Sequence, residues 1–239
     1  MPTPRVVWIT GASSGIGRAL SEEFASHGDI VAATARTLSN LAALESQLGS
    51  SSGACTVFRC DVTDDEQVQA TAGAILSKFG GIDILINNAG VTYFKDFLNT
   101  TIKQFDEVID TNLRGLFLST KAVLPEMLKK GRGSIINVLS YAAKATYTGS
   151  SAYAASKAGA EALMNALRAE TRDKGIKIIN VYPGAVFTPI WHPKHRDKYG
   201  HQMMKPAEVA KVLYEISCQP PSMMMEDVVL RPQIGDLRV

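Results

Sequence analysis

Short apolar segments alternate with helical segments along the whole of this 239-residue chain. Apolar runs bounded by turn residues predict buried strands at 5–10, 30–35, 55–59, 82–86, 134–139, 177–182 and 228–230. Helices are expected at 18–25, 38–48, 63–80, 102–130, 153–172 and 206–217, the third opening with a capping box from Thr63 to Glu66. This alternation is typical of a parallel sheet with helices on both faces. Because no linker or repeat divides the chain, we expect one doubly wound α/β domain spanning 1–239.

Composition excludes several classes of function. Apolar residues make up 46% and charged residues 20%, as in ordinary soluble proteins, and a net charge of +2 argues against nucleic-acid or membrane-surface partners. Cys55, Cys60 and Cys218 are an odd number without metal-ligand spacing, which favours reduced thiols. The N-terminus leads directly into a strand, and no apolar run is long enough to span a membrane. We therefore expect a cytoplasmic protein.

A glycine-rich turn follows the first strand, with the spacing G-x-x-x-G-x-G from Gly11 to Gly17. Gly11 would permit a tight turn, Gly15 would let the backbone approach a pyrophosphate, and Gly17 would let helix and strand pack closely. The helix N-terminus that follows supplies unpaired N–H groups and the positive end of a dipole. A plain glycine-rich turn is the alternative, but the strand before it and the helix after it favour nucleotide binding.

The end of the second strand bears on which nucleotide is bound. NAD sites usually carry an acidic residue there, whereas this chain has Arg36 and no carboxylate until Glu45. A guanidinium suits the 2′-phosphate of NADP(H), with Ser13 as a second donor, although a solvated arginine is the alternative. Asp61 and Val62 end the third strand, where an adenine edge would lie, unless Asp61 simply introduces the next helix.

The stretch 140–157 gathers side chains suited to proton transfer. Tyr153 and Lys157 are one helical turn apart and project from the same helix face. An ammonium beside a phenol lowers the phenol pKa, ordinarily about 10, towards neutrality. Ser140 would hold a carbonyl oxygen at the same place. An exposed contact between neighbouring turns is the alternative for the Tyr–Lys pair alone.

Six motifs follow one another as they do in the short-chain dehydrogenase/reductase family, which the chain resembles from about Val6 to Thr188. They are TGASSGIG at 10–17, NNAG at 87–90, DTNLRG around Asn112, Ser140, YAASK at 153–157 and PGAVFT at 183–188. The resemblance implies a single Rossmann-type domain, a nicotinamide cofactor and a catalytic set of Asn112, Ser140, Tyr153 and Lys157.

The resemblance also implies a role for each member of this set. Tyr153 would protonate the substrate carbonyl as hydride leaves the nicotinamide C4, and Ser140 would polarise that carbonyl. Lys157 would lower the tyrosine pKa and bond the nicotinamide ribose. Asn112 would interrupt its helix and hold a water that connects Lys157 to solvent. The cofactor residues implied are Gly11, Ser13, Ser14, Gly15, Ile16, Gly17, Asn88, Ala89, Gly90, Tyr153, Lys157, Pro183, Gly184, Val186 and Thr188.

Aromatic residues suggest an apolar or aromatic carbonyl substrate, although core or rim packing explains them nearly as well. They are Tyr93, Phe94, Tyr141 and Tyr147. Residues 187–205 look like a substrate loop with apolar anchors at Trp191, Met203 and Met204.

The same loop is basic, and its excess of cations suggests an acidic partner such as an acyl carrier protein; a solvated loop is the favoured interpretation. The charged residues are Lys194, Arg196 and Lys198 against Asp197. Its histidines, at 192, 195 and 201, lack an acidic or cysteine partner, so no metal site is expected.

Small residues on the Tyr153 helix permit close approach of a second helix, and family members commonly pair such helices. They are Ala154, Ala155, Ala158, Gly159, Ala162 and Ala166. A homodimer or homotetramer is therefore expected, unless these residues pack only against the sheet.

The sequence predicts an NADP(H)-dependent oxidoreductase that acts on a small carbonyl or alcohol substrate. Within that class, a 3-oxoacyl-acyl-carrier-protein reductase and a pterin-type reductase are alternatives. An alternative of another class is a regulatory protein that senses NADP(H) without turnover.

Overall fold

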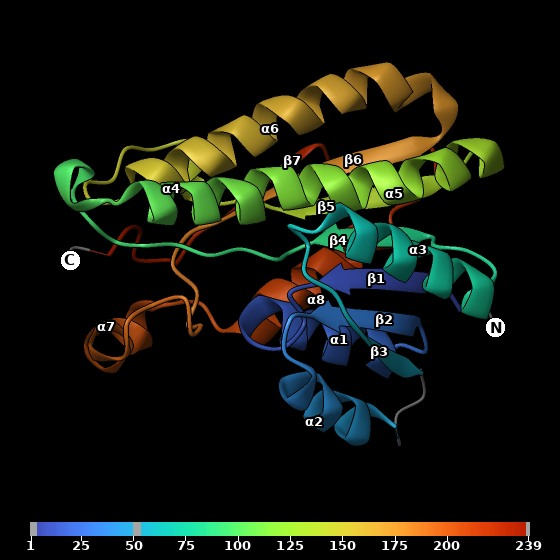
Figure 1. The fold of residues 1–239 in the computed structure, drawn as a ribbon, viewed down its shortest axis with the longest axis horizontal. Helices are drawn as coiled ribbons and strands as arrows, with labels where there is room; N and C mark the ends of the chain where they lie inside the picture. Colours follow the sequence, from blue (N-terminus) through green and yellow to red (C-terminus); the bar gives the residue numbers. More distant parts are fainter. Residues whose placement is uncertain (1–3, 50–53, 238–239) are drawn as a thin grey trace.

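The computed structural model describes residues 4–49 and 54–237, and a parallel sheet lies at their centre (Figure 1). The strand order is β3-β2-β1-β4-β5-β6-β7. The strands are β1 (Val6–Thr10), β2 (Ile30–Ala35), β3 (Cys55–Arg59), β4 (Ile84–Asn87), β5 (Gly133–Val138), β6 (Ile176–Pro183) and β7 (Asp227–Leu230). The chain builds outward from β1 to β3 and then returns to add β4 on the other side of β1, which confirms the predicted doubly wound fold. The first three and last two residues of the predicted 1–239 domain lie outside the described part.

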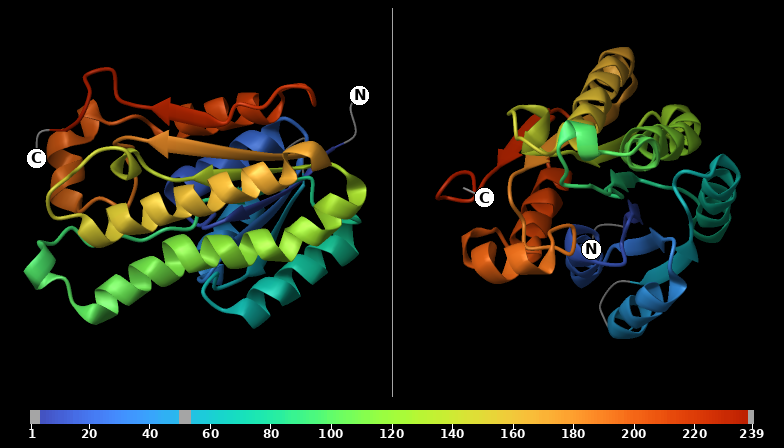
Figure 2. Two further views of the ribbon diagram at one scale, coloured as in Figure 1. Left: turned by 90° about the horizontal axis from the view of Figure 1, so that it is seen from above. Right: turned by 60° about the vertical axis from the view of Figure 1, so that its left-hand side comes forward.

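Helices cover both faces of the sheet, as Figures 1 and 2 show. Helices α1 (Gly15–Ser26), α2 (Leu38–Leu48) and α8 (Pro206–Ser217) pack on one face. On the other face lie α3 (Asp65–Phe79), α5 (Gly115–Lys130) and α6 (Ser151–Thr171), with α4 (Ile102–Ile109) leading into α5. Helix α7 (Pro193–Tyr199) stands apart from both layers (Figure 1).

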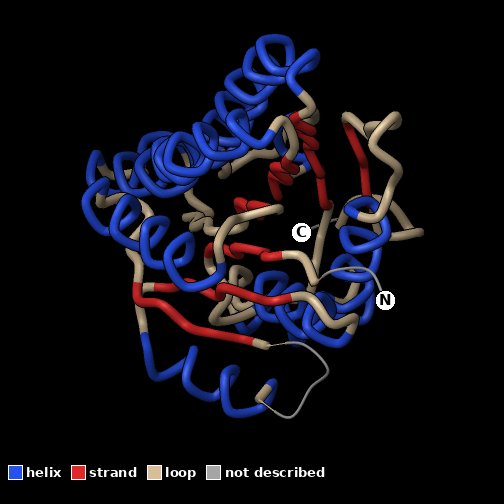
Figure 3. The backbone as a smooth tube through the Cα atoms, turned by 90° about the vertical axis from the view of Figure 1, so that its right-hand side faces the viewer, coloured by secondary structure: helices blue, strands red, loops and turns tan. Residues whose placement is uncertain are grey.

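Strand β1 shows why the sheet is buried on both faces. Val7 and Ile9 belong to the apolar core under α1, α2 and α8, whereas Val6 and Trp8 belong to the core under α3, α5 and α6. Side chains alternate between faces along a strand, so a strand covered on both sides must be apolar throughout. Figure 3 shows the strands enclosed between the two helical layers.

A row of buried asparagines crosses the centre of the sheet. Asn87, Asn137 and Asn180 occupy matching register positions on β4, β5 and β6. The Asn87 Nδ2 donates to the Asn137 Oδ1 at 3.0 Å, and the Asn137 Nδ2 donates to the Asn180 Oδ1 at 3.0 Å. We call these three residues the amide ladder. It lies one to four residues before the loops that follow each strand.

One local prediction needs correction, and another detail concerns the helical segments that lead to Asn112. Helix α3 is capped by Asp64, whose Oδ1 accepts from the Gln67 N–H at 3.1 Å, so the predicted box from Thr63 to Glu66 is wrong by one residue. The helical segments expected at 102–130, with an interruption at Asn112, contain a π-helical turn at Asp110–Arg114. Such turns are rare and often mark functional positions.

The described part of the chain contains no helix with the length and apolar character that a bilayer crossing requires. Cys55, Cys60 and Cys218 are all free thiols.

Candidate active site

A cavity of about 1060 Å³ opens at the carboxyl ends of the strands, where parallel sheets bind their ligands. Its wall contains all but two of the residues selected from the sequence as catalytic or cofactor-binding. Those on the wall are Gly11, Ser13, Ser14, Gly15, Ile16, Arg36, Asp61, Val62, Asn88, Ala89, Gly90, Ser140, Tyr153, Lys157, Pro183, Gly184, Val186 and Thr188. Gly17 and Asn112 lie behind the wall.

The turn between β1 and α1 depends on glycine at three positions. Gly11 has φ +67°, and a Cβ there would lie 2.8 Å from the Ala89 Cα. Gly15 has φ +55° and faces Thr188. A Cβ on Gly17 would lie 2.3 Å from the Gly11 carbonyl oxygen, so Gly17 serves close packing. Because Ser14 makes no side-chain cap, the N–H groups at the start of α1 remain available towards the cavity.

Asn88 holds this turn against the end of β4. Its Nδ2 donates to the backbone carbonyl oxygens of Thr10, at 2.9 Å, and of Gly11, at 3.1 Å. The Thr10 Oγ1 in turn accepts from the N–H groups of Asn88 and Ala89. The two motifs, far apart in sequence, therefore form one rigid floor.

Arg36 and Asp61 occupy the outer rim of this half. Arg36 is exposed directly after β2 and lines the cavity. The Asp61 Oδ1 accepts from the N–H and the hydroxyl of Thr63, at 3.0 and 2.9 Å. Asp61 thus organises the turn into α3, which was the alternative interpretation of this residue, while also lining the cavity.

Ser140, Tyr153 and Lys157 meet in the middle of the cavity. Ser140 follows β5, and its Oγ accepts from the Ala142 N–H at 3.1 Å. Tyr153 and Lys157 lie on one face of α6, with the Lys157 Nζ 5.8 Å from the tyrosine ring centroid. Lys157 is only 4% exposed, and its Nζ donates to the Val138 oxygen at 2.8 Å.

The electrostatics of this pair differ from the prediction. Burial raises the pKa of Tyr153, and the hydrogen bond with the Ser140 side chain only partly offsets that rise. Burial also lowers the pKa of Lys157 to about 8. Desolvation disfavours the charged form of both groups, and Lys157 is not among the causes that shift the tyrosine pKa here.

Asn112 lies in the π-helical turn, and its side chain is fully engaged. Its Oδ1 accepts from the Val91 N–H at 2.8 Å, and its Nδ2 donates to the Val91 oxygen at 2.9 Å and to the Ser156 Oγ at 3.0 Å. It thereby ties the loop after β4 to α6. A Cβ on Gly90 would lie 3.3 Å from the Asn112 Oδ1, which is a tight contact, and 3.6 Å from the Lys157 Nζ, which is an ordinary one.

The other half of the cavity is aromatic. Phe94 and Trp191 stack with ring centroids 5.0 Å apart and planes at 18°. Tyr141 and Tyr147, together with Tyr93, also line it. Two of the predicted apolar anchors in the segment 187–205 do not line the cavity. Met203 is buried, and Met204 packs against the apolar core under α1, α2 and α8.

The C-terminal segment contributes residues that the sequence did not suggest. Asp236 lines the cavity, and burial, together with the hydrogen bond between Tyr147 and Asp236, raises the pKa of Tyr147 to about 12. Arg231 pairs with Asp236 at 2.8 Å and lies 4.4 Å from the centroid of the Tyr141 ring. No local pattern signals the contacts with Tyr147 and Tyr141, because these partners are far apart in sequence from Asp236 and Arg231.

The loop histidines have separate surroundings. His192 caps α7 by accepting from the Lys194 N–H at 3.3 Å, and its ring centroid lies 6.2 Å from that of His195. His195 lines the cavity. Across residues 4–49 and 54–237, no three His, Cys, Asp or Glu side chains gather in a metal-binding arrangement.

The comparison with known families decides the assignment. The model of the short chain dehydrogenase family matches residues 5–199, which covers β1 to α7 and every residue of the cavity except the C-terminal segment. The chain belongs to the short-chain dehydrogenase family. This confirms the resemblance seen in the motifs, and with it an oxidoreductase that acts on alcohol or carbonyl groups with a nicotinamide cofactor.

Three similar proteins cover most of this short-chain dehydrogenase. A sepiapterin reductase of Chlorobaculum tepidum is 33% identical over 98% of both chains. A 2-(R)-hydroxypropyl-CoM dehydrogenase of Xanthobacter autotrophicus is 38% identical over 81% of both chains. The crystal structure of a metagenomic short-chain oxidoreductase in complex with NADP is 30% identical, with a TM-score of 0.84, and matches 96% of this chain and 97% of the other.

Proposed function

We propose that this protein is an NADP(H)-dependent carbonyl reductase or alcohol dehydrogenase, with Tyr153 as its acid–base residue. The observation that carries the proposal is that Ser140, Tyr153 and Lys157 share one cavity with the glycine-rich turn. A surface contact between Tyr153 and Lys157 is not compatible with a lysine that is 4% exposed.

The residues on the cavity wall fit a nicotinamide dinucleotide. Gly11 and Gly15 bring the turn against Ala89 and Thr188, and the open N-terminus of α1 beside it suits a pyrophosphate. When bound, the cofactor supplies the hydride for the carbonyl carbon. The protonated Tyr153 phenol would give its proton to the carbonyl oxygen, and the Ser140 hydroxyl would hold that oxygen in place. Lys157 would stabilise the phenolate left behind and bond the cofactor ribose.

The preference for NADP(H) rests on Arg36. Its guanidinium is exposed at the rim where the adenosine 2′-phosphate would lie, and Ser13 lines the same part of the cavity. Asp61, with one carboxylate oxygen engaged by Thr63, is a residue for the adenine edge together with Val62. The NADP complex of a structural relative supports this choice.

The substrate class follows from the aromatic half. The stacked Phe94 and Trp191 suit a flat or apolar carbonyl compound. The pterin-type alternative gains support from the full-length match to a sepiapterin reductase. The acyl-carrier alternative rests only on Lys194, Arg196 and Lys198. The two lysines are exposed on α7, whereas the Arg196 guanidinium lies 6.0 Å from the centroid of the Phe187 ring.

A homodimer or homotetramer is part of the proposal. Several small residues of α6 are exposed, so they do not pack only against the sheet: Ala155, Ala158, Ala162 and Ala166. Phe105 and Phe117 on the neighbouring helices are each 43% exposed. A second copy of this helical layer would cover both features. Because the three free thiols suit a reducing compartment, we also infer a cytoplasmic location.

The test is NADPH oxidation by the purified protein with a panel of aromatic ketones, diketones, pterin carbonyls and acyl thioesters. Turnover of a free carbonyl compound supports the proposal, and the best member of the panel names the substrate class. Tight NADPH binding with no turnover across the panel would instead establish the NADP(H) sensor.

A further inference from the structure

The inner face of α6 continues beyond the proposed catalytic pair. Tyr153, Lys157 and Glu161 follow one another at intervals of four residues, so their side chains lie on the same face of the helix. Helical Cα–Cβ bonds tilt towards the N-terminus, which directs a glutamate at 161 back over the turn that carries Lys157. The sequence alone therefore places a carboxylate within reach of the buried lysine.

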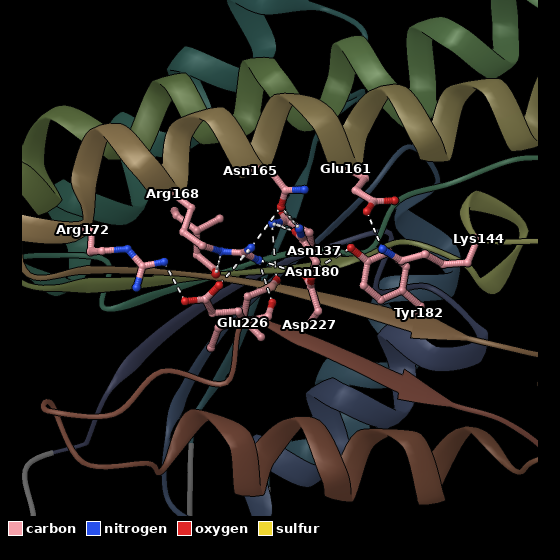
Figure 4. A network of polar contacts seen from close by, with 12 residues as sticks. Asn137, Lys144, Glu161, Asn165, Arg168, Arg172, Asn180, Tyr182, Glu226 and Asp227 are labelled. Carbon is pink, nitrogen blue, oxygen red and sulfur yellow. Dashed lines mark hydrogen bonds and ion pairs between the residues drawn. The ribbon is translucent and has the colours of Figure 1, made fainter.

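Lys144 engages that carboxylate instead. It lies just after the turn Tyr141–Ala143, in the loop between Ser140 and Tyr153, and its Nζ forms an ion pair and hydrogen bond with the Glu161 Oε1. Figure 4 shows Lys144 reaching Glu161 beside the ring of Tyr182, whose centroid is 4.3 Å from the Nζ. The Lys144 and Glu161 side chains are 34% and 18% exposed, so solvent screens this pair only in part.

Lys157 meets a different environment. Its Nζ donates to the Val138 oxygen, and burial is the cause of its lowered pKa, with no carboxylate contributing. On the side of Lys157 that faces the loop after β4 lie Gly90 and the hydrogen-bonded amide of Asn112. Within the described residues, the buried lysine therefore has no anionic partner among the ion pairs.

We propose that Lys144 is a positioning residue that holds the Glu161 carboxylate away from Lys157, so that the Lys157 charge stays available to the tyrosine and the cofactor. The effect of Lys144 on catalysis rests on the proposed function. Its effect on the charge near Lys157 rests only on the geometry of α6. A carboxylate released next to Lys157 would pair with it and neutralise the field that Tyr153 experiences.

Few groups that titrate or carry charge lie around Lys157 and the Lys144–Glu161 ion pair. From α6 they are Tyr153, Glu161 and, through its ion pair with Asp227 at 3.1 Å, Arg168. The loop adds Lys144 and β6 adds Tyr182. Strand β7 adds Asp227, which accepts from the Tyr182 hydroxyl at 3.2 Å. Burial is the main cause that raises the pKa of Tyr182, with Asp227 and Glu161 adding to it, so that tyrosine stays neutral at the pH values of interest.

The first test measures the pKa of Lys157 directly, by NMR titration of protein labelled with ¹³Cε-lysine. Loss of one signal in Lys157→Met identifies the residue. In Lys144→Met, we expect the Lys157 pKa to rise by about one pH unit, because an opposite charge nearby favours the charged form. Lys144→Met with Glu161→Gln should return it to the native value, and Lys144→Arg, which keeps the pair, should leave it there.

The matched control is Glu161→Gln alone, which frees Lys144 without leaving a carboxylate behind. We expect the pKa of Lys157 in this variant to equal that in the native protein. If Lys144 acted only as a clamp on the loop, Lys144→Met and Glu161→Gln would lower kcat alike and the double variant would not recover. An unchanged Lys157 titration in Lys144→Met, or a double variant that fails to return, overturns the inference.

The pH dependence of kcat/KM is the second readout. In Lys144→Met, the pKa of its alkaline limb should rise by about one pH unit, as the Lys157 pKa does. In the double variant it should equal the native value. The two proposals fail separately. A native protein without carbonyl turnover whose Lys157 titration still responds as described refutes the enzyme assignment alone. Normal turnover with an unresponsive Lys157 refutes the role of Lys144 alone.

Discussion

The two halves of the cavity are built in different ways. The half with the glycine-rich turn consists of backbone and short motifs, and Asn88 closes it with hydrogen bonds to the Thr10 and Gly11 oxygens. The aromatic half consists of side chains from distant segments, such as the stacked Phe94 and Trp191. The first arrangement tolerates little change in ligand, whereas the second can be altered one residue at a time. Tyr153 and Lys157 stand where the halves meet.

The largest effect should come from Tyr153→Phe, which removes the proton donor without disturbing either half. We expect kcat to fall by about 10²–10⁴-fold, the usual contribution of a general acid. NADPH affinity, measured by fluorescence titration, should stay the same. Undiminished turnover would refute the proposed mechanism.

Lys157→Met tests the cost of burying a charge at the same meeting point. The lysine pKa is about 8 in the fold against 10.5 otherwise, a difference of 2.5 units, which corresponds to about 3 kcal/mol. The unfolded chain binds the proton more strongly, so the penalty is complete below pH 8 and fades as the pH rises towards 10.5. The lost bond to the Val138 oxygen offsets about 1 kcal/mol.

Urea unfolding should therefore show Lys157→Met more stable than the native protein by about 2 kcal/mol at pH 7, with the advantage lost at pH 10. The variant should be nearly inactive. An identical difference at both pH values would mean that the buried charge is not what destabilises the fold.

Arg36→Asp addresses the backbone-built half alone. A hydrogen bond to a charged group contributes about 1.5–3 kcal/mol, so the preference for NADPH over NADH should fall by about 10–100-fold. Arg36→Lys, which keeps the charge but loses the paired donors, should give an intermediate value. The substrate KM should not change. A preference that survives in Arg36→Asp would remove the 2′-phosphate assignment.

Trp191→Ala should have the smallest effect, confined to the aromatic half. Stacked pairs contribute about 0.5–1.5 kcal/mol beyond area burial, so the KM of an aromatic carbonyl substrate should rise by up to about tenfold. Trp191→Phe keeps the stack with Phe94 and serves as the control. A change in NADPH affinity in Trp191→Ala would show that the two halves are coupled.

The fold and the backbone-built half were predictable because their signals are local. Alternating apolar strands and helices give the sheet, and the glycines at 11, 15 and 17 carry their requirement for space in the sequence itself. Helix α7 was missed because it has only seven residues, too few for periodicity, although His192 and Pro193 form a recognisable start.

The remaining differences arise from burial and from long-range contact. The lysine at 157 was expected to lower the pKa of Tyr153, but the sequence does not reveal how deeply both groups are desolvated. Asp236 meets Tyr147 only because the chain after β7 returns over the cavity. Such pairings follow from the completed fold and have no local signature.

The amide ladder has a consequence for how the sheet assembles. Slippage of β5 by a single position would break both ladder bonds at once and turn Asn137 into the apolar layer on the other face. Misregistered intermediates are thus penalised in the middle of the molecule. The register of β4, β5 and β6 at the ladder also sets the positions of the segments 88–90, 139–140 and 183–184, which follow just downstream.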